Sequence, residues 1–495
     1  MRLPLAAIAV VALVGGGVAA AEATMPDPAR PRAPVRRLTP VVGSLAICPE
    51  LLPAGGAVTT RLTLGTAQAG DVKVEAAAVG GTAAVTVALD GGGHVAPFTA
   101  PAPSTAAVLA SATGAASGGV VVEQLARGDR GNGRGLAGVR CEATAAESWF
   151  VGAATTISDD TDLVLVNPYD DAAVVDVTFV DSTDEPIDVP GARGVAVPPR
   201  SRVVRPLAAW VPGRAAFAVK VAAQSGRVSS AVRRSRVVDG VPSGVDWLPR
   251  TDRPAETVTL GALPAGNGSR TLLLVNPGDE PALAKVIVTH VDGQFVPDGL
   301  AELVVPAHRL LQVPLTDVLG GKAAGVRVTT DGRPLLAGAV ADNQGAGKAQ
   351  EIAFLAGLAA LDGPALLTDT RSTSGADTRL LLFAPDGAAE VTITGVPVRG
   401  ASGPPPVPKV VVLQHGELQS VRVASVTRGR DGAVVVTPSG NSSAVYGTRV
   451  VSASTPTGPL LTTLGIRSQS VAGVPVPAVS ADPRAWLVPV TEPAR

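Results

Sequence analysis

The feature that most constrains the fold of this chain is an internal repeat with an interval of about 108 residues. The segment LVLVNP at 163–168 returns as LLLVNP at 272–277 and, in degraded form, as LLFAP at 381–385. A second marker, VP followed by seven residues and PL, occurs at 197–207 and again at 305–315. Two markers that keep the same order and interval predict tandem modules of about a hundred residues each.

The segments after these markers have the pattern of β-strands. VVDVTFV at 174–180 and KVIVTHV at 285–291 alternate apolar and polar residues, which is typical of half-buried strands. Farther along each module, two Val-rich runs flank a Ser-Gly or Asp-Gly turn, at 216–232, 324–340 and 433–448. Because such dipeptides favour tight turns between paired strands, each of these units is expected to be a β-hairpin.

Composition agrees with strands rather than helices. The chain has 56 glycines and 43 prolines among 495 residues, and few stretches without these breakers are long enough for a helix. About seven short strands per module fit a β-sandwich, whereas a propeller blade has four strands and is much shorter. The predicted fold class is all-β, with tandem β-sandwich (immunoglobulin-like) modules. The predicted modules span residues 41–148, 149–247, 248–354 and 355–495.

The N-terminus predicts export. Residues 3–21 form an uncharged apolar run behind Arg2 and end in several alanines, so residues 1–24 are expected to be a signal peptide. An uncleaved membrane anchor is the alternative, weakened by three consecutive glycines from Gly15. Residues 25–40, with five prolines and four arginines, are expected to form an extended linker. In either case the body lies outside the cytoplasm, secreted or anchored on the outer face of the cytoplasmic membrane.

The two cysteines, Cys48 and Cys141, both fall in the first module. In an exported chain an even pair is most simply one disulfide, which would stabilise the module by about 4–5 kcal/mol in the chain-entropy estimate. Two unpaired thiols are the alternative. A metal site is disfavoured because no histidine is near either cysteine in sequence.

No pattern in the sequence predicts catalysis, a cofactor or a metal site. There is no G-x-S-x-G motif, and the histidines are far apart: His94, His290, His308 and His415. GNGRG at 131–135 lacks the context of a phosphate-binding loop and is interpreted as a hairpin loop. Two acidic clusters are interpreted as solvated loops, with weak calcium binding as the alternative: Asp159, Asp160 and Asp162, and Asp181, Asp184, Glu185 and Asp188. Paired carboxylates for glycoside hydrolysis remain open, since sequence does not give their separation.

Two groups of residues have structural interpretations. Trp149, Trp247 and Phe354 stand at the expected joins of an aromatic-poor chain, so they are expected to pack one module on the next. Stacking against a ligand is the alternative. Asn167 and Asn276 each precede a proline and are expected to end a strand and begin a turn.

The chain resembles a family of secreted actinobacterial proteins in four features. These are a signal-like N-terminus, Cys48-Pro49, the stretch CEATAAESWFVGAAT at 141–155 and the LVLVNP that follows it. This family is the domain of unknown function numbered 5719. The resemblance covers most of the mature chain, and its most specific part is the Cys…Ser-Trp-Phe-Val-Gly…Asn-Pro run. It implies export in a high-GC Gram-positive organism, and it implies no activity and no catalytic residues.

These patterns predict a non-catalytic exported protein of the cell envelope, a modular scaffold or binding protein. The expected partners are a cell-wall polymer or an envelope protein, with membrane contact through the N-terminal segment if it is not cleaved. Binding of nucleic acid is not expected, because the chain has 41 basic and 42 acidic residues and therefore no excess of positive charge. Two alternatives are an exported enzyme or enzyme accessory acting on wall glycans, and an assembly factor for a membrane glycosyltransferase.

Overall fold

The structure is a computed structural model that describes residues 36–50, 58–68, 70–89, 95–99, 105–131, 133–183, 187–344, 350–370, 376–398, 405–430, 432–469 and 473–477. These residues form antiparallel β-sheets with a few one-turn helices, which confirms the all-β prediction. In this described part no helix is long and apolar enough to cross a membrane. The predicted signal peptide at 1–24 and the first part of the linker, 25–35, lie outside the described residues.

Contacts divide the chain into two units, Met1–Pro40 with Ala472–Arg495, and Val41–Val471. In the first unit, β1 (Arg36–Thr39) pairs antiparallel with β35 (Val474–Pro477), so that Arg36 lies opposite Pro477. The end of the expected linker is therefore a strand that pairs with a segment from the other end of the chain.

In the described residues of the second unit, four modules follow one another along the chain. Module 1 contains β2 (Gly43–Cys48), β3 (Val58–Thr66), β4 (Val72–Ala78), β5 (Ala84–Leu89), β6 (Val95–Phe98), β7 (Val108–Thr113), η1 (Ser117–Gly119), β8 (Val120–Gly128) and β9 (Gly135–Arg140). Module 2 contains β10 (Glu147–Ala153), β11 (Asp159–Asn167), β12 (Ala173–Asp181), η2 (Pro190–Ala192), β13 (Val195–Val197), β14 (Ser201–Pro206), η3 (Leu207–Ala209), β15 (Phe217–Ser225), β16 (Ser229–Val238) and β17 (Val241–Leu248).

The other two modules repeat this series. Module 3 contains β18 (Thr257–Leu263), β19 (Arg270–Asn276), β20 (Ala282–His290), β21 (Gly293–Phe295), β22 (Leu303–Val305), β23 (Arg309–Pro314), α2 (Thr316–Leu319), β24 (Ala324–Thr330), β25 (Leu336–Gln344) and β26 (Gln350–Leu358). Module 4 contains β27 (Ala365–Leu367), β28 (Ala376–Phe383), β29 (Ala389–Pro397), β30 (Lys409–Leu413), β31 (Leu418–Arg422), α3 (Ala424–Thr427), β32 (Gly432–Pro438), β33 (Tyr446–Thr455) and β34 (Gly458–Gly465).

Each module is a sandwich of two sheets with the same strand order. In module 2 the sheets are β10-β15-β12-β13 and β14-β11-β16-β17, and modules 1 and 4 have the corresponding orders. Module 3 adds the short strand β21, and pairing of β18 with β26 joins its two sheets. The repeat seen most clearly in modules 2 and 3 therefore extends, by strand order, to the first and last modules.

The connections between modules differ from the expected boundaries. The expected boundaries at 148/149, 247/248 and 354/355 fall inside β10, β17 and β26. The connecting segments are instead 141–146, 249–256 and 359–364. The aromatic residues used to place the joins are strand residues that reach across to the neighbouring module.

The hairpin prediction at 216–232, 324–340 and 433–448 is wrong. In each case the two Val-rich runs are strands that are not hydrogen-bonded to each other: β15 and β16, β24 and β25, and β32 and β33. The glycine turn still reverses the chain, as at Gly226 with φ +70°. The two runs do not pair with each other: in module 2, β15 pairs with β10 and β12, whereas β16 pairs with β11 and β17, so the turn connects the two layers of the sandwich.

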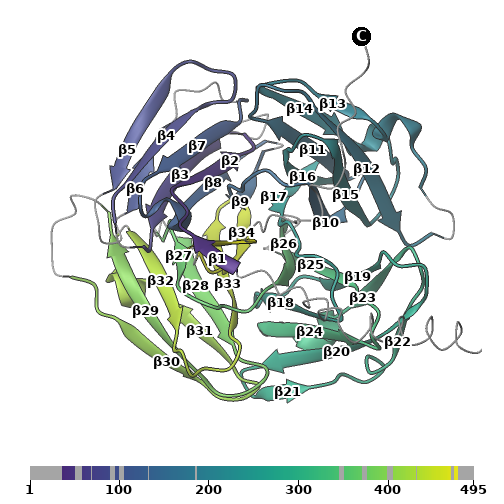
Figure 1. The fold of residues 1–495 in the computed structure, drawn as a ribbon. Coiled ribbons are helices and arrows are strands. Elements are labelled where there is room, and N and C mark those ends of the chain that lie inside the picture. Colours follow the sequence, from purple (N-terminus) through teal and green to yellow (C-terminus); the bar gives the residue numbers. More distant parts are fainter. Residues whose placement is uncertain are drawn as a thin grey trace, which may run out of the picture. The chain divides into compact units, whose positions relative to one another are not determined.

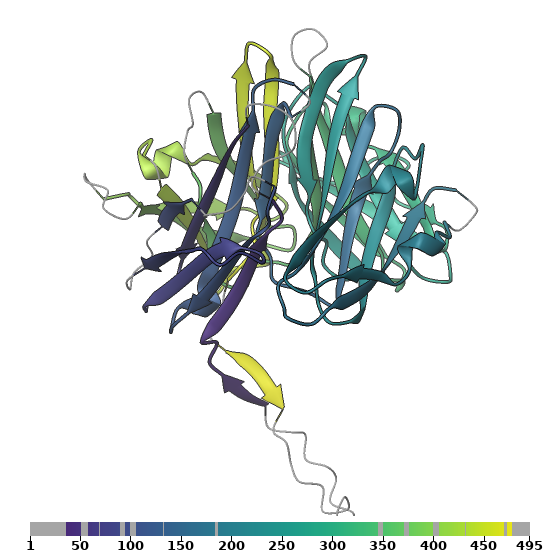
Figure 2. The same cartoon turned by 90° about the horizontal axis from the view of Figure 1, so that it is seen from above.

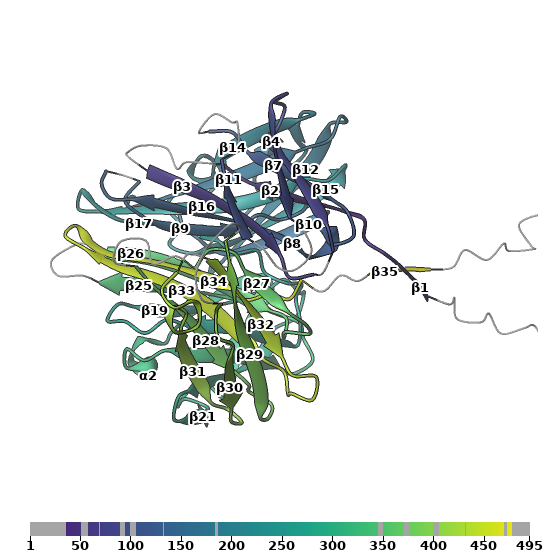
Figure 3. The same ribbon diagram turned by 90° about the vertical axis from the view of Figure 1, so that its left-hand side faces the viewer.

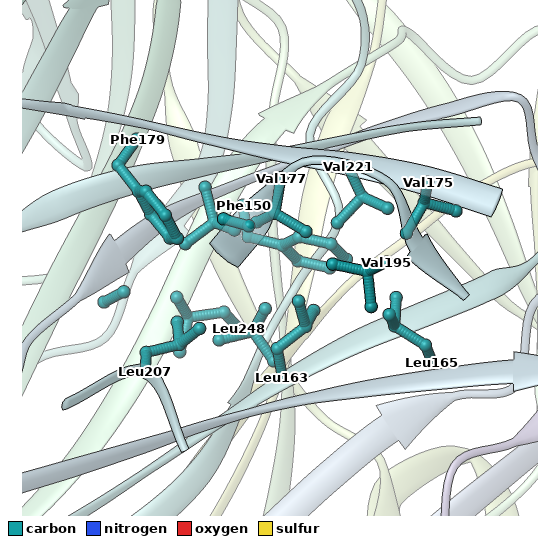
Figure 4. Close-up of a cluster of buried hydrophobic side chains, with 14 of the residues drawn as sticks. Phe150, Leu163, Leu165, Val175, Val177, Phe179, Val195, Leu207, Val221 and Leu248 are labelled. Atoms are coloured by element: carbon teal, nitrogen blue, oxygen red, sulfur yellow. The ribbon is translucent and has the colours of Figure 1, made fainter. Parts of the chain in front are cut away.

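Alternating burial builds the core of each sandwich. Along β12, Val175, Val177 and Phe179 are buried, whereas Thr178 is exposed, as the alternating pattern predicted. Figure 4 shows these side chains between the two sheets of module 2, facing Leu163 and Leu165 of β11. Full burial of one such Val or Leu side chain contributes about 1.5–3 kcal/mol.

The four modules of this unit surround a common axis (Figure 1). The last strand of each module, β9, β17, β26 or β34, lies on the inner side, and in Figure 3 β9 and β17 face β26 and β34. Viewed at right angles to Figure 1, the sheets of modules 1 and 2 stand side by side (Figure 2).

An apolar cluster joins every neighbouring pair, the last module with the first included. The cluster between modules 1 and 2 includes Ile47, Ala137, Val164 and Trp247, and the cluster between modules 2 and 3 includes Trp149, Val151, Leu273 and Leu336. The cluster between modules 3 and 4 includes Ala262, Ala353, Leu381 and Leu461, and the cluster between modules 4 and 1 includes Leu136, Val451, Ala453 and Leu460. The modules therefore form a closed ring.

Candidate binding site on the axis of the ring

One arginine ties the four inner strands together at one end of the axis. Arg134, directly before β9, is buried with 3% of its surface exposed. Its Nη1 donates to the carbonyl oxygens of Pro242 (3.5 Å) and Gln350 (2.9 Å), and its Nη2 donates to that of Pro459 (2.7 Å). These partners lie 108, 216 and 325 residues farther along the chain, close to the corresponding repeat positions of the other three modules.

Two buried acids lie farther along the same axis. Asp246 of β17 accepts hydrogen bonds from the backbone N–H of Gly138 (3.0 Å) and of Trp247 (2.8 Å), and from Thr462 Oγ1 (3.0 Å). Burial raises the pKa of Asp246 well above its usual range, although these hydrogen bonds oppose the rise. Burial likewise raises the pKa of Glu351 in β26, where Arg134 opposes the rise and Asp246 adds to it.

Three arginines gather just beyond the inner strands. Arg140 ends β9, while Arg250 and Arg467 follow β17 and β34. Arg140 Nη1 donates to the carbonyl oxygen of Arg467 (3.5 Å), and Arg467 Nη2 donates to that of Arg250 (3.1 Å). Arg250 in turn forms an ion pair with Glu142, two residues after Arg140. Each guanidinium thus contacts a residue that follows the inner strand of a different module, and we call the three arginines the arginine mouth.

Two cavities meet at the arginine mouth. The inner cavity, of about 70 Å³, lies among the inner strands and is lined by residues of all four modules, including Phe150, Trp247, Phe354 and Leu464. The outer cavity, of about 390 Å³, is lined by Ala359, Ala360 and the segment around Cys141. Arg140, Glu142, Arg250 and Arg467 line both cavities.

The disulfide stands next to this mouth. Cys48, at the end of β2, is bonded to Cys141, which directly follows Arg140, with the two Cα atoms 4.5 Å apart. The predicted bond is present in the structure, and it anchors the end of β9 to the first strand of module 1. The structure therefore gives the disulfide a role beyond stapling the module, because it also fixes the backbone that carries Arg140.

The aromatic residues of the expected joins pack between modules, as predicted. Trp149 belongs to one buried apolar cluster with Leu273, Val275 and Leu310 of module 3. Phe354, although it belongs to β26, packs into the core of module 2. Trp247 and Phe354 also line the inner cavity, so contact with a ligand remains open for both.

The two asparagines behave as expected. Asn167 Oδ1 accepts a hydrogen bond from the N–H of Tyr169 (3.0 Å), and Asn276 Oδ1 accepts one from the N–H of Gly278 (2.9 Å). Each amide nitrogen donates to a carbonyl oxygen four residues on, Asp171 or Glu280. Both asparagines therefore close turns at the ends of strands.

The histidines lie apart from the mouth. His290 Nδ1 lies 3.1 Å from the carbonyl oxygen of Ala323, and the ring stacks on Phe295. His308 Nε2 lies 2.9 Å from Asp279 Oδ1, and His415 is exposed. His94 lies outside the described residues. No group of three or more potential metal ligands occurs within the described ranges.

The acidic residues of the two expected clusters bind mainly arginines. Asp159 accepts from Arg234 and Arg236, and Asp162 pairs with Arg233 (2.7 Å). The coulombic pull of these arginines, against desolvation, lowers the pKa of Asp159. In the second cluster the ion pairs are Asp181 with Arg214 and Asp188 with Arg193, and Asp160 of the first cluster is exposed. Asp184 and Glu185 lie outside the described residues.

Reasoning from the sequence missed Arg134, Asp246, Glu351 and the arginine mouth. GNGRG at 131–135, which contains Arg134, does lie between the paired strands β8 and β9, as the hairpin interpretation requires. The available signal was periodic: Arg140, Arg250 and Arg467 recur near the 108-residue interval, each at or just after the last strand of its module.

These features define a class of protein, a closed ring of β-sandwich modules with a cavity and an arginine mouth on its axis. A family model matches residues 95–424, and the chain belongs to that family, the family of unknown function (DUF5719). The match runs from β6 to α3 and includes three of the inner strands, β9, β17 and β26. No curated protein matches the sequence.

Proposed function

We propose that this chain is a non-catalytic, exported protein of an actinobacterial cell envelope, which acts as a rigid platform and binds wall polymer or an envelope protein. The observation that carries the proposal is the axial site, which all four modules build together. A site made in this way depends on the whole ring and is held by many buried contacts, which favours rigid binding of a ligand.

The chemistry of the site favours binding over catalysis. The described residues that line the inner cavity include Arg140, Arg250 and Arg467 and a single carboxylate, Glu142, which is paired with Arg250. Hydrolysis of glycosides requires two carboxyl groups about 5–10 Å apart. The geometry thus supports the binding protein better than the enzyme acting on wall glycans.

Two features support export. The disulfide between Cys48 and Cys141 is of the kind that persists in oxidising compartments. The apolar run at 3–21 has the composition of a secretory signal. If the protein is exported, both cysteines resist alkylation of the denatured chain until a reductant is added.

The test is retention of the full mature chain, produced with its own N-terminus in a Gram-positive host, on purified cell-wall polymer. We expect saturable retention and no release of soluble sugar. Mass spectrometry of the mature N-terminus shows whether residues 1–24 are removed. Release of reducing sugar contradicts the non-catalytic role. Equal retention of a heat-unfolded sample contradicts specific binding to wall polymer, and the envelope protein is then tested as the partner by crosslinking in intact cells.

A further inference from the structure

The arginine mouth has an asymmetry that points to a ligand. Three modules place an arginine at or just after the last strand, while module 3 has Ala359 and Ala360 after β26. Both alanines line the outer cavity together with the three arginines, and the exposed Asp362 of the same segment also lines it. Module 3 therefore contributes small side chains and an exposed acid to this cavity where the other modules contribute arginines.

The three arginines are unequally neutralised. Arg250 is paired with Glu142, and Arg467 Nη1 is paired with Asp252 (2.7 Å). Within the described part of the chain, no carboxylate oxygen lies at ion-pair distance from the Arg140 guanidinium, and its one side-chain hydrogen bond there is the long contact with the Arg467 carbonyl oxygen. A guanidinium has five N–H donors, so most donors of Arg140 are left for solvent or a ligand.

The surroundings of Arg140 make an anion favourable. Burial lowers the pKa of its guanidinium, and the charges of Arg467 and Arg250 lower it further, against Glu142 and Glu123. A bound anion would offset the cost of burying this charge and the repulsion between the like charges. One unpaired guanidinium matches one carboxylate, which it can hold through two parallel hydrogen bonds.

The inner cavity defines what the anion carries. Behind the guanidinium groups the walls include Trp247, Phe354, Leu358 and Leu464. Gly138 of β9 faces Leu464, and a Cβ atom at this position would lie 2.7 Å from its Cδ1. The cavity of about 70 Å³ is thus small and largely apolar, and it suits a short aliphatic group.

We propose that the arginine mouth binds a carboxylate attached to a short apolar group, with the carboxylate on Arg140 and the apolar group in the inner cavity. This inference rests on the proposed binding function and names the ligand chemistry of its axial site. The carboxylate can come from a free short-chain acid or from the terminal residue of a peptide, since both present the same chemistry to Arg140.

The test is titration calorimetry of the full-length protein with acetate, butyrate and hexanoate, and with N-acetylleucine against N-acetylleucinamide. Butyrate is expected to bind about sixteenfold more tightly than acetate, since it has two more methylenes and each buried methylene contributes about a fourfold gain. If the site accepts the terminal residue of a peptide, N-acetylleucine binds and N-acetylleucinamide does not. If the three short-chain acids bind and N-acetylleucine does not, the source of the carboxylate is a free short-chain acid. Inorganic phosphate at the same concentrations measures the binding of anions in general.

Two variants locate the site. Arg140→Gln is expected to weaken butyrate binding at least tenfold, Arg140→Lys to restore part of it, and Arg333→Gln, at an exposed ion pair of module 3, to leave it unchanged. Ala356→Leu narrows the inner cavity and leaves the arginines in place, so acetate is expected to bind while the gain from acetate to butyrate disappears. Calorimetric unfolding identifies variants that do not fold.

The proposal is overturned if butyrate shows no saturable binding, if Arg140→Gln binds it as the parent does, or if phosphate binds as tightly as butyrate. A protein that is retained on wall polymer but binds no carboxylate refutes this inference and leaves the proposed function standing. A protein that binds carboxylates at Arg140, is not retained on wall polymer and crosslinks to no envelope protein refutes the proposed function and leaves this inference standing.

Discussion

At the scale of single residues, the axis concentrates groups that are costly to bury. Asp246 and Glu351 are both fully buried. Asp246 is well compensated by three hydrogen-bond donors, whereas Glu351 Oε2 has no hydrogen-bond partner among the described atoms. A buried polar group without a partner is expensive, and ionisation increases the cost. Glu351 is therefore the less compensated of the two acids.

Glu351 is expected to make stability fall as pH rises. Burial raises its pKa in the folded chain above the unfolded value of about 4.3. A raised carboxyl pKa means that stability is complete below the unfolded value and is lost as the pH rises through the folded value. In Glu351→Gln this loss should disappear, so the free energy of unfolding, measured in urea between pH 5 and pH 8, should depend less on pH.

The control is Glu302→Gln, which changes an exposed glutamate of module 3 and should keep the pH dependence of the parent. An unchanged slope in Glu351→Gln would show that this carboxyl group does not titrate differently in the folded and unfolded states.

At the scale of elements, the inner strands approach so closely that backbone meets backbone. Gly244 in β17 has φ +114°, and a Cβ atom there would lie 2.6 Å from the Ile352 N of β26 and even closer to Glu351 Oε1. In the same way, a Cβ atom on Gly135 in β9 would lie 2.7 Å from the Val245 N of β17. Glycine at these positions is required by the contact between modules as well as by the local conformation.

Gly244→Ala should therefore destabilise the ring more than Gly293→Ala. Both glycines have φ well beyond the left-handed helical region, at +114° and +129°, but a Cβ atom on Gly293 meets nothing within 4 Å. The difference reports the contact between β17 and β26 and should be about 1–3 kcal/mol, the usual cost of overpacking. Urea unfolding of the two variants measures it, and equal losses would mean that the inner strands separate easily.

At the scale of the whole molecule, the ring closes through a buried polar network between its first and last modules. Glu123 Oε2 of β8 accepts hydrogen bonds from Arg449 Nη1 (3.0 Å), from the N–H of Thr368 (2.9 Å) and from Thr368 Oγ1 (2.8 Å). Arg449 lies 326 residues from Glu123, so this contact connects the first and last modules of the ring. Closure of this kind is expected to make the modules unfold together.

Glu123→Ala should lower the stability of the whole ring by about 3–5 kcal/mol, because it leaves the Arg449 charge buried without its partner. Three of the four tryptophans, Trp149, Trp210 and Trp247, lie in module 2, which contributes no residue to this contact between modules 1 and 4. Tryptophan fluorescence and circular dichroism should therefore report the same lowered urea midpoint.

Glu75→Gln, which removes an exposed ion pair with Lys73, should change the midpoint little. If the fluorescence midpoint stays unchanged in Glu123→Ala while circular dichroism shifts, the modules unfold one by one and the ring is not cooperative.

Much of this protein follows from local sequence patterns. The period-two alternation predicted strands such as β12, because a strand sends successive side chains to opposite faces. The asparagine turns and the pairing of Cys48 with Cys141 were also predictable, since asparagine bonds its own local backbone and two cysteines allow one intramolecular bond.

Only the tertiary structure decided which strands pair and how the modules meet. The same glycine turn can connect two paired strands or two layers of a sandwich, and the hairpin prediction failed because the flanking runs pair with other strands and not with each other. Arg134, Asp246 and Arg140 show nothing unusual in their local sequence. They become a site because strands about 108 residues apart converge on one axis, and that convergence is set by packing between modules, which no local pattern records.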